Sequence, residues 1–163
     1  MISPVAQALL SLAAAARTTA DLAVGMALDV DNLDPDGMGP RIQAARELGM
    51  AALTVRRWRI IAELLAGADL DAVAEELDLS PLSVRATFGA AVDAMRAPVP
   101  AGQLNPQMLG DDTPGSRHDP DPWGTAEQLD GWLRRHADLV EVAEPGPVTW
   151  ALLTLAEPDG KPQ

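Results

Sequence analysis

LDAVAEELDLSPLSVRATFGAAV, the stretch from Leu70 to Val92, has the apolar spacing of two short helices that meet at an angle. Ala74 is small at the point where two such helices cross closely. Four apolar residues are placed to fill the angle between the helices: Leu77, Leu79, Val84 and Phe88. The spacing therefore predicts a helix-turn-helix over about residues 70–95.

The expected ends of these two helices carry capping residues. Asp69 precedes a helix predicted over about residues 70–77, and Ser80 precedes one predicted to end near Arg96. Asp and Ser side chains accept hydrogen bonds from the free N–H groups of a first helical turn. Pro81 follows Ser80, and proline fits the first helical position because it has no N–H to leave unsatisfied.

Two longer helices are predicted before this stretch. Ser3 and Pro4 begin an apolar, alanine-rich helix over about residues 4–29, and Pro40 begins a second over about 40–66, with Gly49 as a potential kink. The first helix has almost no polar interruption over its first three turns, which is more apolar surface than a helix usually covers against one neighbour. We expect it to be buried or to form the face of a homodimer.

The remainder of the chain differs in composition. Residues 97–124 are rich in proline and glycine and poor in large apolar side chains, which is typical of a linker. Thr125 and Gln128 then form a capping box. We expect a helical domain over residues 1–96, a linker over 97–124 and a C-terminal appendage over 125–157.

The appendage is predicted to hold a helix over residues 125–137 and a β-hairpin. Alternating apolar residues favour strands over 139–143 and 148–155, joined by a turn rich in proline and glycine. The hairpin could be the wing of a winged-helix unit, or a lid over the N-terminal core with Trp132 and Trp150 as anchors. The fold class expected for the whole chain is mainly α, with a helix-turn-helix core, a long N-terminal helix, and a small C-terminal helix plus β-hairpin.

The overall charge disfavours nucleic acid as a partner. The 163 residues carry 24 Asp and Glu against 12 Lys and Arg, a net charge of −12, whereas affinity for DNA depends on cations that replace counterions at phosphates. The absence of cysteine fits a reducing compartment. The apolar run from Val5 to Ala16 is too short to span a bilayer. We expect a cytoplasmic protein without a membrane partner, and the arginine-rich, lysine-poor composition suggests a bacterial genome of high GC content.

The helix-turn-helix stretch resembles the DNA-binding helix-turn-helix of LuxR-type regulators and of the sigma factor region that recognises the −35 element. The resemblance covers about residues 57–95 and rests on Gly67, Val73-Ala74, Leu77, Leu79-Ser80 and Ser83-Val84-Arg85. Asp78 stands at a turn position where the family favours glycine, and Asp tolerates left-handed backbone better than most residues. The resemblance implies a three-helix DNA-binding module that regulates transcription.

Two groups of residues are candidates for contacting DNA. The resemblance implies that Ser80, Ser83, Arg85 and Thr87 face the major groove. The basic cluster VRRWR adds Arg56, Arg57 and Arg59 as candidate phosphate contacts. An alternative is that these arginines pair with carboxylates such as Glu63 on a solvated helix face while Trp58 enters the core.

The second candidate function is protein binding without DNA. The exposed side of the recognition helix is bare of the Arg, Lys, Asn and Gln side chains that read base edges. Its apolar positions Leu82, Ala86 and Ala90 could instead contact another polypeptide, such as a basic surface of the transcription machinery. The two hypotheses are therefore a small DNA-binding regulator of bacterial transcription and an acidic adaptor on a degenerate helix-turn-helix scaffold.

Catalysis and cofactor binding find no support in the sequence. His118 and His136 are isolated, and there is no glycine-rich phosphate loop. The stretch from Asn32 to Gln43 resembles a calcium loop, but its last position is Gln43 in place of the glutamate that binds the ion through both oxygens. We expect an interhelical turn there, no metal, no cofactor and no enzymatic activity.

Overall fold

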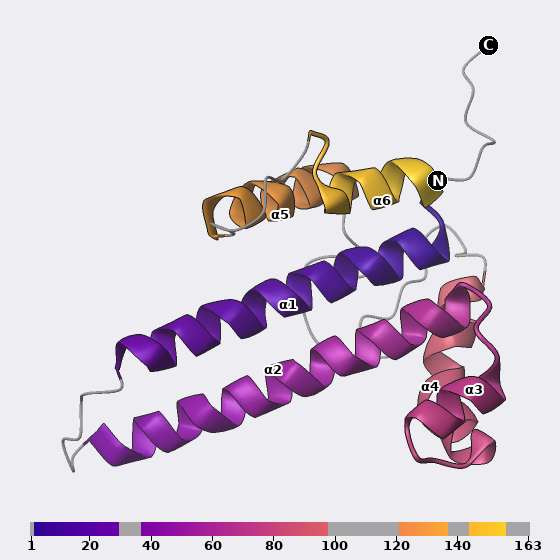
Figure 1. The fold of residues 1–163 in the computed structure, drawn as a ribbon, viewed down its shortest axis with the longest axis horizontal. Helices are drawn as coiled ribbons and strands as arrows, with labels where there is room; N and C mark the ends of the chain where they lie inside the picture. The colour runs from indigo at the N-terminus through magenta and orange to yellow at the C-terminus, as the bar shows by residue number, and fades with distance from the viewer. Residues whose placement is uncertain (1, 30–36, 98–120, 137–143, 156–163) are drawn as a thin grey trace.

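The structure is a computed structural model that describes residues 2–29, 37–97, 121–136 and 144–155. These residues form six helices and no strand (Figure 1). The helices are α1 (Pro4–Leu28), α2 (Met38–Leu65), α3 (Leu70–Glu76), α4 (Pro81–Arg96), α5 (Pro122–His136) and α6 (Pro147–Leu155). The prediction of a mainly α fold is confirmed.

The two long helices α1 and α2 lie side by side and form the centre of the molecule (Figure 1). Ser3 caps α1 by accepting a hydrogen bond of 3.1 Å from the N–H of Ala6. The α2 helix continues through Gly49 without interruption. The shared core of the molecule contains the small residues Ala8 and Ala15 from α1 and the large residues Trp58 and Ile61 from α2. Alanines on α1 allow the close approach that buries the larger side chains of α2.

The two shorter helix pairs pack onto different helices of this hairpin. The α4 helix packs on α2 and α3 packs on α4, whereas α5 and α6 cover α1 (Figure 1). A second core there contains Ala6, Leu10, Ala14, Leu129 and Leu152. The N-terminal half of α1 is therefore buried between α2 and the α5–α6 pair. Contacts within one chain already account for the apolar surface that suggested a dimer face on this helix.

The prediction of a β-strand over residues 148–155 is wrong, because this segment lies in α6. Pro147 occupies the first position of α6, and the carboxylate of Asp130 accepts hydrogen bonds from the N–H groups of Val148 (3.0 Å) and Thr149 (2.9 Å). Asp130 is fully buried, so α5 supplies the cap of α6. The other strand, predicted over 139–143, lies outside the described residues.

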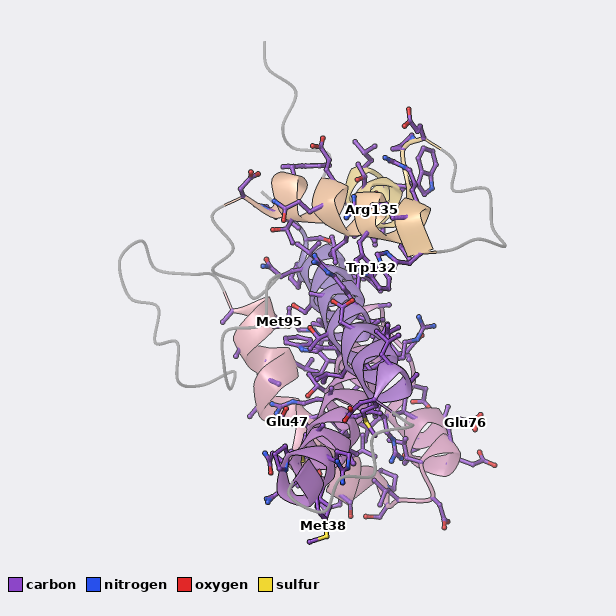
Figure 2. The ribbon with its side chains drawn as sticks, turned by 90° about the vertical axis from the view of Figure 1, so that its left-hand side faces the viewer. Met38, Glu47, Glu76, Met95, Trp132 and Arg135 are labelled. Carbon is purple, nitrogen blue, oxygen red and sulfur yellow. The ribbon has the colours of Figure 1, made fainter. Side chains whose placement is uncertain are left out.

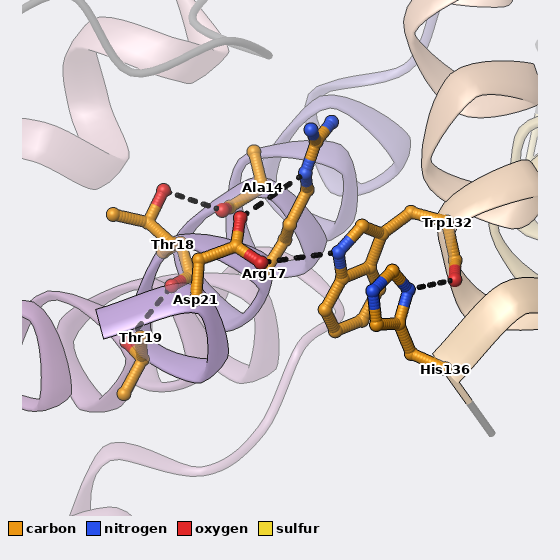
Figure 3. A network of polar contacts seen from close by, with 8 residues as sticks. Ala14, Arg17, Thr18, Thr19, Asp21, Trp132 and His136 are labelled. Atoms are coloured by element: carbon orange, nitrogen blue, oxygen red, sulfur yellow. Dashed lines mark hydrogen bonds and ion pairs between the residues drawn. The ribbon is translucent and has the colours of Figure 1, made fainter. Parts of the chain in front are cut away.

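The C-terminal helices are anchored differently from the predicted lid. Trp132 is partly buried and donates from Nε1 to Asp21 on α1 over 3.2 Å, and it stacks on His136 with ring centroids 4.7 Å apart (Figure 3). Trp150, predicted to be buried as the second anchor, is 58 % exposed. Leu152 is instead the residue of α6 that is buried in the core. A helix in place of the second strand also leaves no basis for the winged-helix interpretation.

The start of α5 also differs from the prediction. The helix begins at Pro122 and not at Thr125, because the side chain of Asp121 accepts a 2.9 Å hydrogen bond from the N–H of Gly124.

Among the described helices, none combines the length and the apolar character needed to cross a membrane.

Candidate functional site

The turn between α3 and α4 has the backbone geometry that the sequence predicts. Gly67 ends the preceding helix with a φ of +97°, and Asp78 has a φ of +54°. The N–H of Leu79 donates to the carbonyl of Ala74 over 2.9 Å and closes the turn. Asp69 accepts from the N–H of Ala72 at the start of α3. The predicted N-caps of both helices, Asp69 and Ser80, are thus confirmed.

The α4 helix is held against α2 by an apolar face and by one side chain. Val84 and Phe88 are buried with Ile60 and Leu64 of α2 in the shared core. Arg96 Nη2 donates to the carbonyl of Leu64 over 2.9 Å, and the same carbonyl also accepts from the N–H of Gly67 over 3.3 Å. No local pattern predicts this contact, because a basic residue in the last turn of a helix can equally well face solvent.

The hydroxyl groups proposed to face DNA form hydrogen bonds within the N-terminal turns of α4. Ser80 Oγ accepts from the N–H of Ser83 over 3.1 Å, and the two serine hydroxyls lie 2.8 Å apart. Thr87 Oγ1 donates to the carbonyl of Ser83 over 2.8 Å. Each of these side chains would have to exchange or share a local hydrogen bond to contact a base.

The arginines proposed to contact DNA lie on different sides of the α4 helix. Arg85 lines a hollow of about 160 Å³ together with Leu64 near the end of α2. Arg56 and Arg57 line a groove of about 320 Å³ on the other side of α4, together with Thr87. The structure thus brings Arg56, Arg57 and Thr87 together and leaves Arg85 apart from them. Arg56 and Arg57 therefore do not form one basic face with Arg85.

Arg59 follows the alternative interpretation of the basic cluster. It forms an ion pair with Glu63, one helical turn further along α2, while Trp58 is 5 % exposed and packs in the core. Both side chains of the pair are largely exposed, so the pair contributes little to stability. Arg59 is therefore the least available of the three arginines for a phosphate.

The outer face of α4 is apolar and uncovered. Leu82 is 78 % exposed, and Ala86 and Ala90 are exposed beside it. The spacing of four residues places the three side chains in one row on the helix. Asp93 continues the row toward the end of α4 and is also exposed.

The groove that contains Arg56 and Arg57 has an apolar floor. Leu53, Ile60 and Phe88 line it, and Leu79 adds a side chain that is 45 % exposed. The prediction that Leu79 fills the angle between the helices is therefore only partly right, because much of this side chain faces solvent. Leu77, Val84 and Phe88 do lie within or against the core.

The helix-turn-helix is strongly acidic on its surface. Between Ala66 and Ala97 the chain has six carboxylates and two guanidinium groups. The carboxylates belong to Asp69, Asp71, Glu75, Glu76, Asp78 and Asp93, and all six residues are exposed. The repulsion between these groups and phosphates acts against DNA binding and favours a partner of positive charge.

Within the described residues, no group of three or more His, Asp or Glu side chains is arranged to hold a metal ion. Comparison of the chain with protein families, curated proteins and solved structures finds no match. The candidate site consequently rests on the residues and geometry of α2, α3 and α4.

Proposed function

We propose that this chain is an acidic adaptor that acts in bacterial transcription and binds another protein through the outer face of α4. The observation that carries the proposal is the row formed by Leu82, Ala86 and Ala90, which is apolar, exposed and bordered by Asp93. Leu82 is the only large side chain of the row, and burying it in an apolar pocket of a partner would remove most of its exposed apolar surface from water.

The chemistry of the surface indicates the kind of partner. Leu82 would insert into an apolar pocket, and the carboxylates around the α3–α4 turn would lie against arginine or lysine side chains at the rim of that pocket. The resemblance to helix-turn-helix modules supports a component of the transcription machinery as the source of such a surface. The partner of this proposal is RNA polymerase or one of its associated proteins.

A binding assay with one substitution tests the proposal. RNA polymerase with its associated factors, purified from the source bacterium, is titrated into the fluorescently labelled chain. We expect binding that weakens at least about tenfold in the Leu82→Glu variant, since a buried anchor typically contributes that much or more. The control is Leu28→Glu, because Leu28 is 85 % exposed at the far end of α1. Equal binding by the wild type and Leu82→Glu, or no binding by the wild type, contradicts the proposal.

The second candidate is a DNA-binding regulator. The left-handed Asp78 in the turn and the capped start of α4 support this candidate, because DNA-binding helix-turn-helix units also join two helices by a short turn. In this case Arg56 and Arg57 would contact phosphates, with Arg85, Ser80, Ser83 and Thr87 toward the groove. The two functions differ in their dependence on salt and on arginine, since DNA affinity falls steeply as salt increases.

A further inference from the structure

The groove that contains Arg56 and Arg57, which we call the α2–α4 groove, has the size and the lining of a small-molecule site. Its volume of about 320 Å³ lies at the lower end of the range for such sites, which are typically apolar with a few polar groups. Five of its eight lining residues are apolar: Leu53, Ile60, Leu77, Leu79 and Phe88. The α2 side of the groove is one helix face over two turns, formed by Leu53, Arg56, Arg57 and Ile60.

The polar residues of the α2–α4 groove offer positively charged hydrogen-bond donors. Neither the Arg56 nor the Arg57 guanidinium group forms an ion pair or a hydrogen bond with another described residue. Thr87, the third polar residue of the lining, already donates its hydroxyl hydrogen to the carbonyl of Ser83. A guanidinium group donates hydrogen bonds and accepts none. The groove is therefore complementary to a ligand that has an anionic acceptor on an apolar body.

The carboxylates of this acidic chain do not occupy the groove. The net charge is −12, yet among the described residues none with a carboxylate lines the groove. Figure 2 shows Glu76, the last residue of α3, with its side chain directed away from α2. Arg59, by contrast, pairs with Glu63 on α2. The two arginines of the groove thus keep their donors for an anion from outside the described part of the chain.

We propose that the α2–α4 groove binds a medium-chain carboxylic acid. The alkyl chain lies on Leu53, Ile60 and Phe88, and the carboxylate accepts hydrogen bonds from Arg56 and Arg57. A carboxylate fits these side chains because one guanidinium group can donate two parallel N–H bonds to it. From Leu53 to Ile60 the α2 helix advances about 10 Å. An extended chain of eight carbons is about 9 Å long, since each C–C bond adds about 1.25 Å along the chain.

Octanoate is the probe, and a titration followed by two-dimensional ¹H–¹⁵N NMR measures both its affinity and its location. We expect saturable shifts of the amide signals of Leu79, Thr87 and Phe88. The expected dissociation constant is about 0.2 to 2 mM, as is usual for a ligand of about ten non-hydrogen atoms. Shifts that do not saturate, or that are largest outside the residues of the groove, overturn the proposal.

Octan-1-ol tests the contribution of the carboxylate. It has the same chain length and no charge, so it should bind about fivefold more weakly or worse, which is the loss expected for two exposed charge pairs. Equal affinity for the acid and the alcohol would show that the arginines do not select the ligand, and it would overturn the proposal.

Two pairs of substitutions on α2 test the arginines. The Arg56→Gln, Arg57→Gln double variant should bind octanoate about fivefold more weakly or worse. Its control, Arg46→Gln with Arg59→Gln, removes the same charge from exposed positions on the same helix that do not line the groove. Because salt screens distant exposed charges, the control should stay within about twofold of the wild type. Equal binding by the two double variants contradicts the assigned site.

A second matched pair tests the apolar part of the groove. Leu53→Gln changes a side chain that is 56 % exposed, so the helix keeps its core contacts while the groove loses apolar surface. We expect octanoate to bind about threefold more weakly or worse. The control Val24→Gln changes a side chain that is 55 % exposed on α1, and it should bind like the wild type. Unchanged affinity in Leu53→Gln would place the alkyl chain elsewhere and overturn the proposal.

This site is independent of the function proposed for the outer face of α4. Leu82, Ala86 and Ala90 do not line the α2–α4 groove, so Leu82→Glu should bind octanoate like the wild type. The Arg56→Gln, Arg57→Gln double variant should likewise leave binding to RNA polymerase measurable. Loss of octanoate binding and loss of polymerase binding are therefore separate outcomes.

Discussion

Replacing the buried Asp130 by Asn should destabilise the contact between α5 and α6. The carboxylate of Asp130 accepts two hydrogen bonds, from Val148 and Thr149, and its side chain is fully buried. Asparagine keeps one acceptor oxygen but turns an NH₂ group toward the second N–H donor. One charge-assisted hydrogen bond is then lost and a donor is left facing a donor, which costs about 2 to 3 kcal/mol.

Urea unfolding followed by circular dichroism at 222 nm measures this loss. Glu127→Gln is the matched control, because Glu127 is exposed on the same helix and undergoes the same chemical change from carboxylate to amide. We expect the control to stay within about 0.5 kcal/mol of the wild type. If Asp130→Asn also stays within that margin, Asp130 does not cap α6, and the helical assignment of this segment loses its physical explanation.

Three further substitutions test the core and the turn, each by the same urea titration. Gly67→Ala should lower the free energy of unfolding by about 1 kcal/mol or more, because Gly67 has a φ of +97°, and an unchanged value would contradict that backbone. Asp78→Val should cost about 1 to 2 kcal/mol, since a β-branched residue is strained at a φ of +54°; a neutral result would show that the turn adopts another conformation. Ile61→Ala should cost about 2 to 5 kcal/mol, because this side chain is fully buried between the long helices, and a loss below 1 kcal/mol would place it outside the core.

The elements that the sequence predicts well are those whose signals are local. Ser3, Asp69 and Ser80 each accept a hydrogen bond from an N–H three residues later, so a few adjacent residues determine where each helix begins. Asp78 adopts the left-handed backbone for the same local reason. Val84 and Phe88 are buried because the spacing of the helix places them on one side.

The errors arise where distant residues decide the structure. Residues 148–155 alternate enough to favour a strand, and Pro145 and Pro147 suggest a hairpin turn. The helix forms because Asp130 caps it from another element and because Leu152 packs in the same core as Leu10 of α1. Pro147 before an apolar run was the available local signal for a helix start.

The candidate site also has features that local spacing predicts and features that depend on distant contacts. The exposed position of Leu82 follows from helical spacing and was predicted correctly as part of an apolar face. The separation of Arg85 from Arg56 and Arg57 depends on how α4 crosses α2, which no local pattern specifies. The contact from Arg96 to the carbonyl of Leu64 spans 32 residues and was also inaccessible from the sequence.

Our proposal for the α3–α4 unit is that it binds another protein through the outer face of α4 and does not bind DNA. The most direct test is a titration of labelled random duplex DNA with the chain at about 50 mM salt, followed by fluorescence anisotropy. A DNA-binding protein with several cationic contacts would bind detectably there, because non-specific dissociation constants are about 10⁻⁴ to 10⁻⁶ M even at physiological salt. The surface of α3 and α4 predicts no saturable binding up to about 50 µM protein, a concentration that covers much of that range. Saturable binding that weakens steeply with salt and is lost in the Arg56→Ala, Arg57→Ala double variant would contradict the claim.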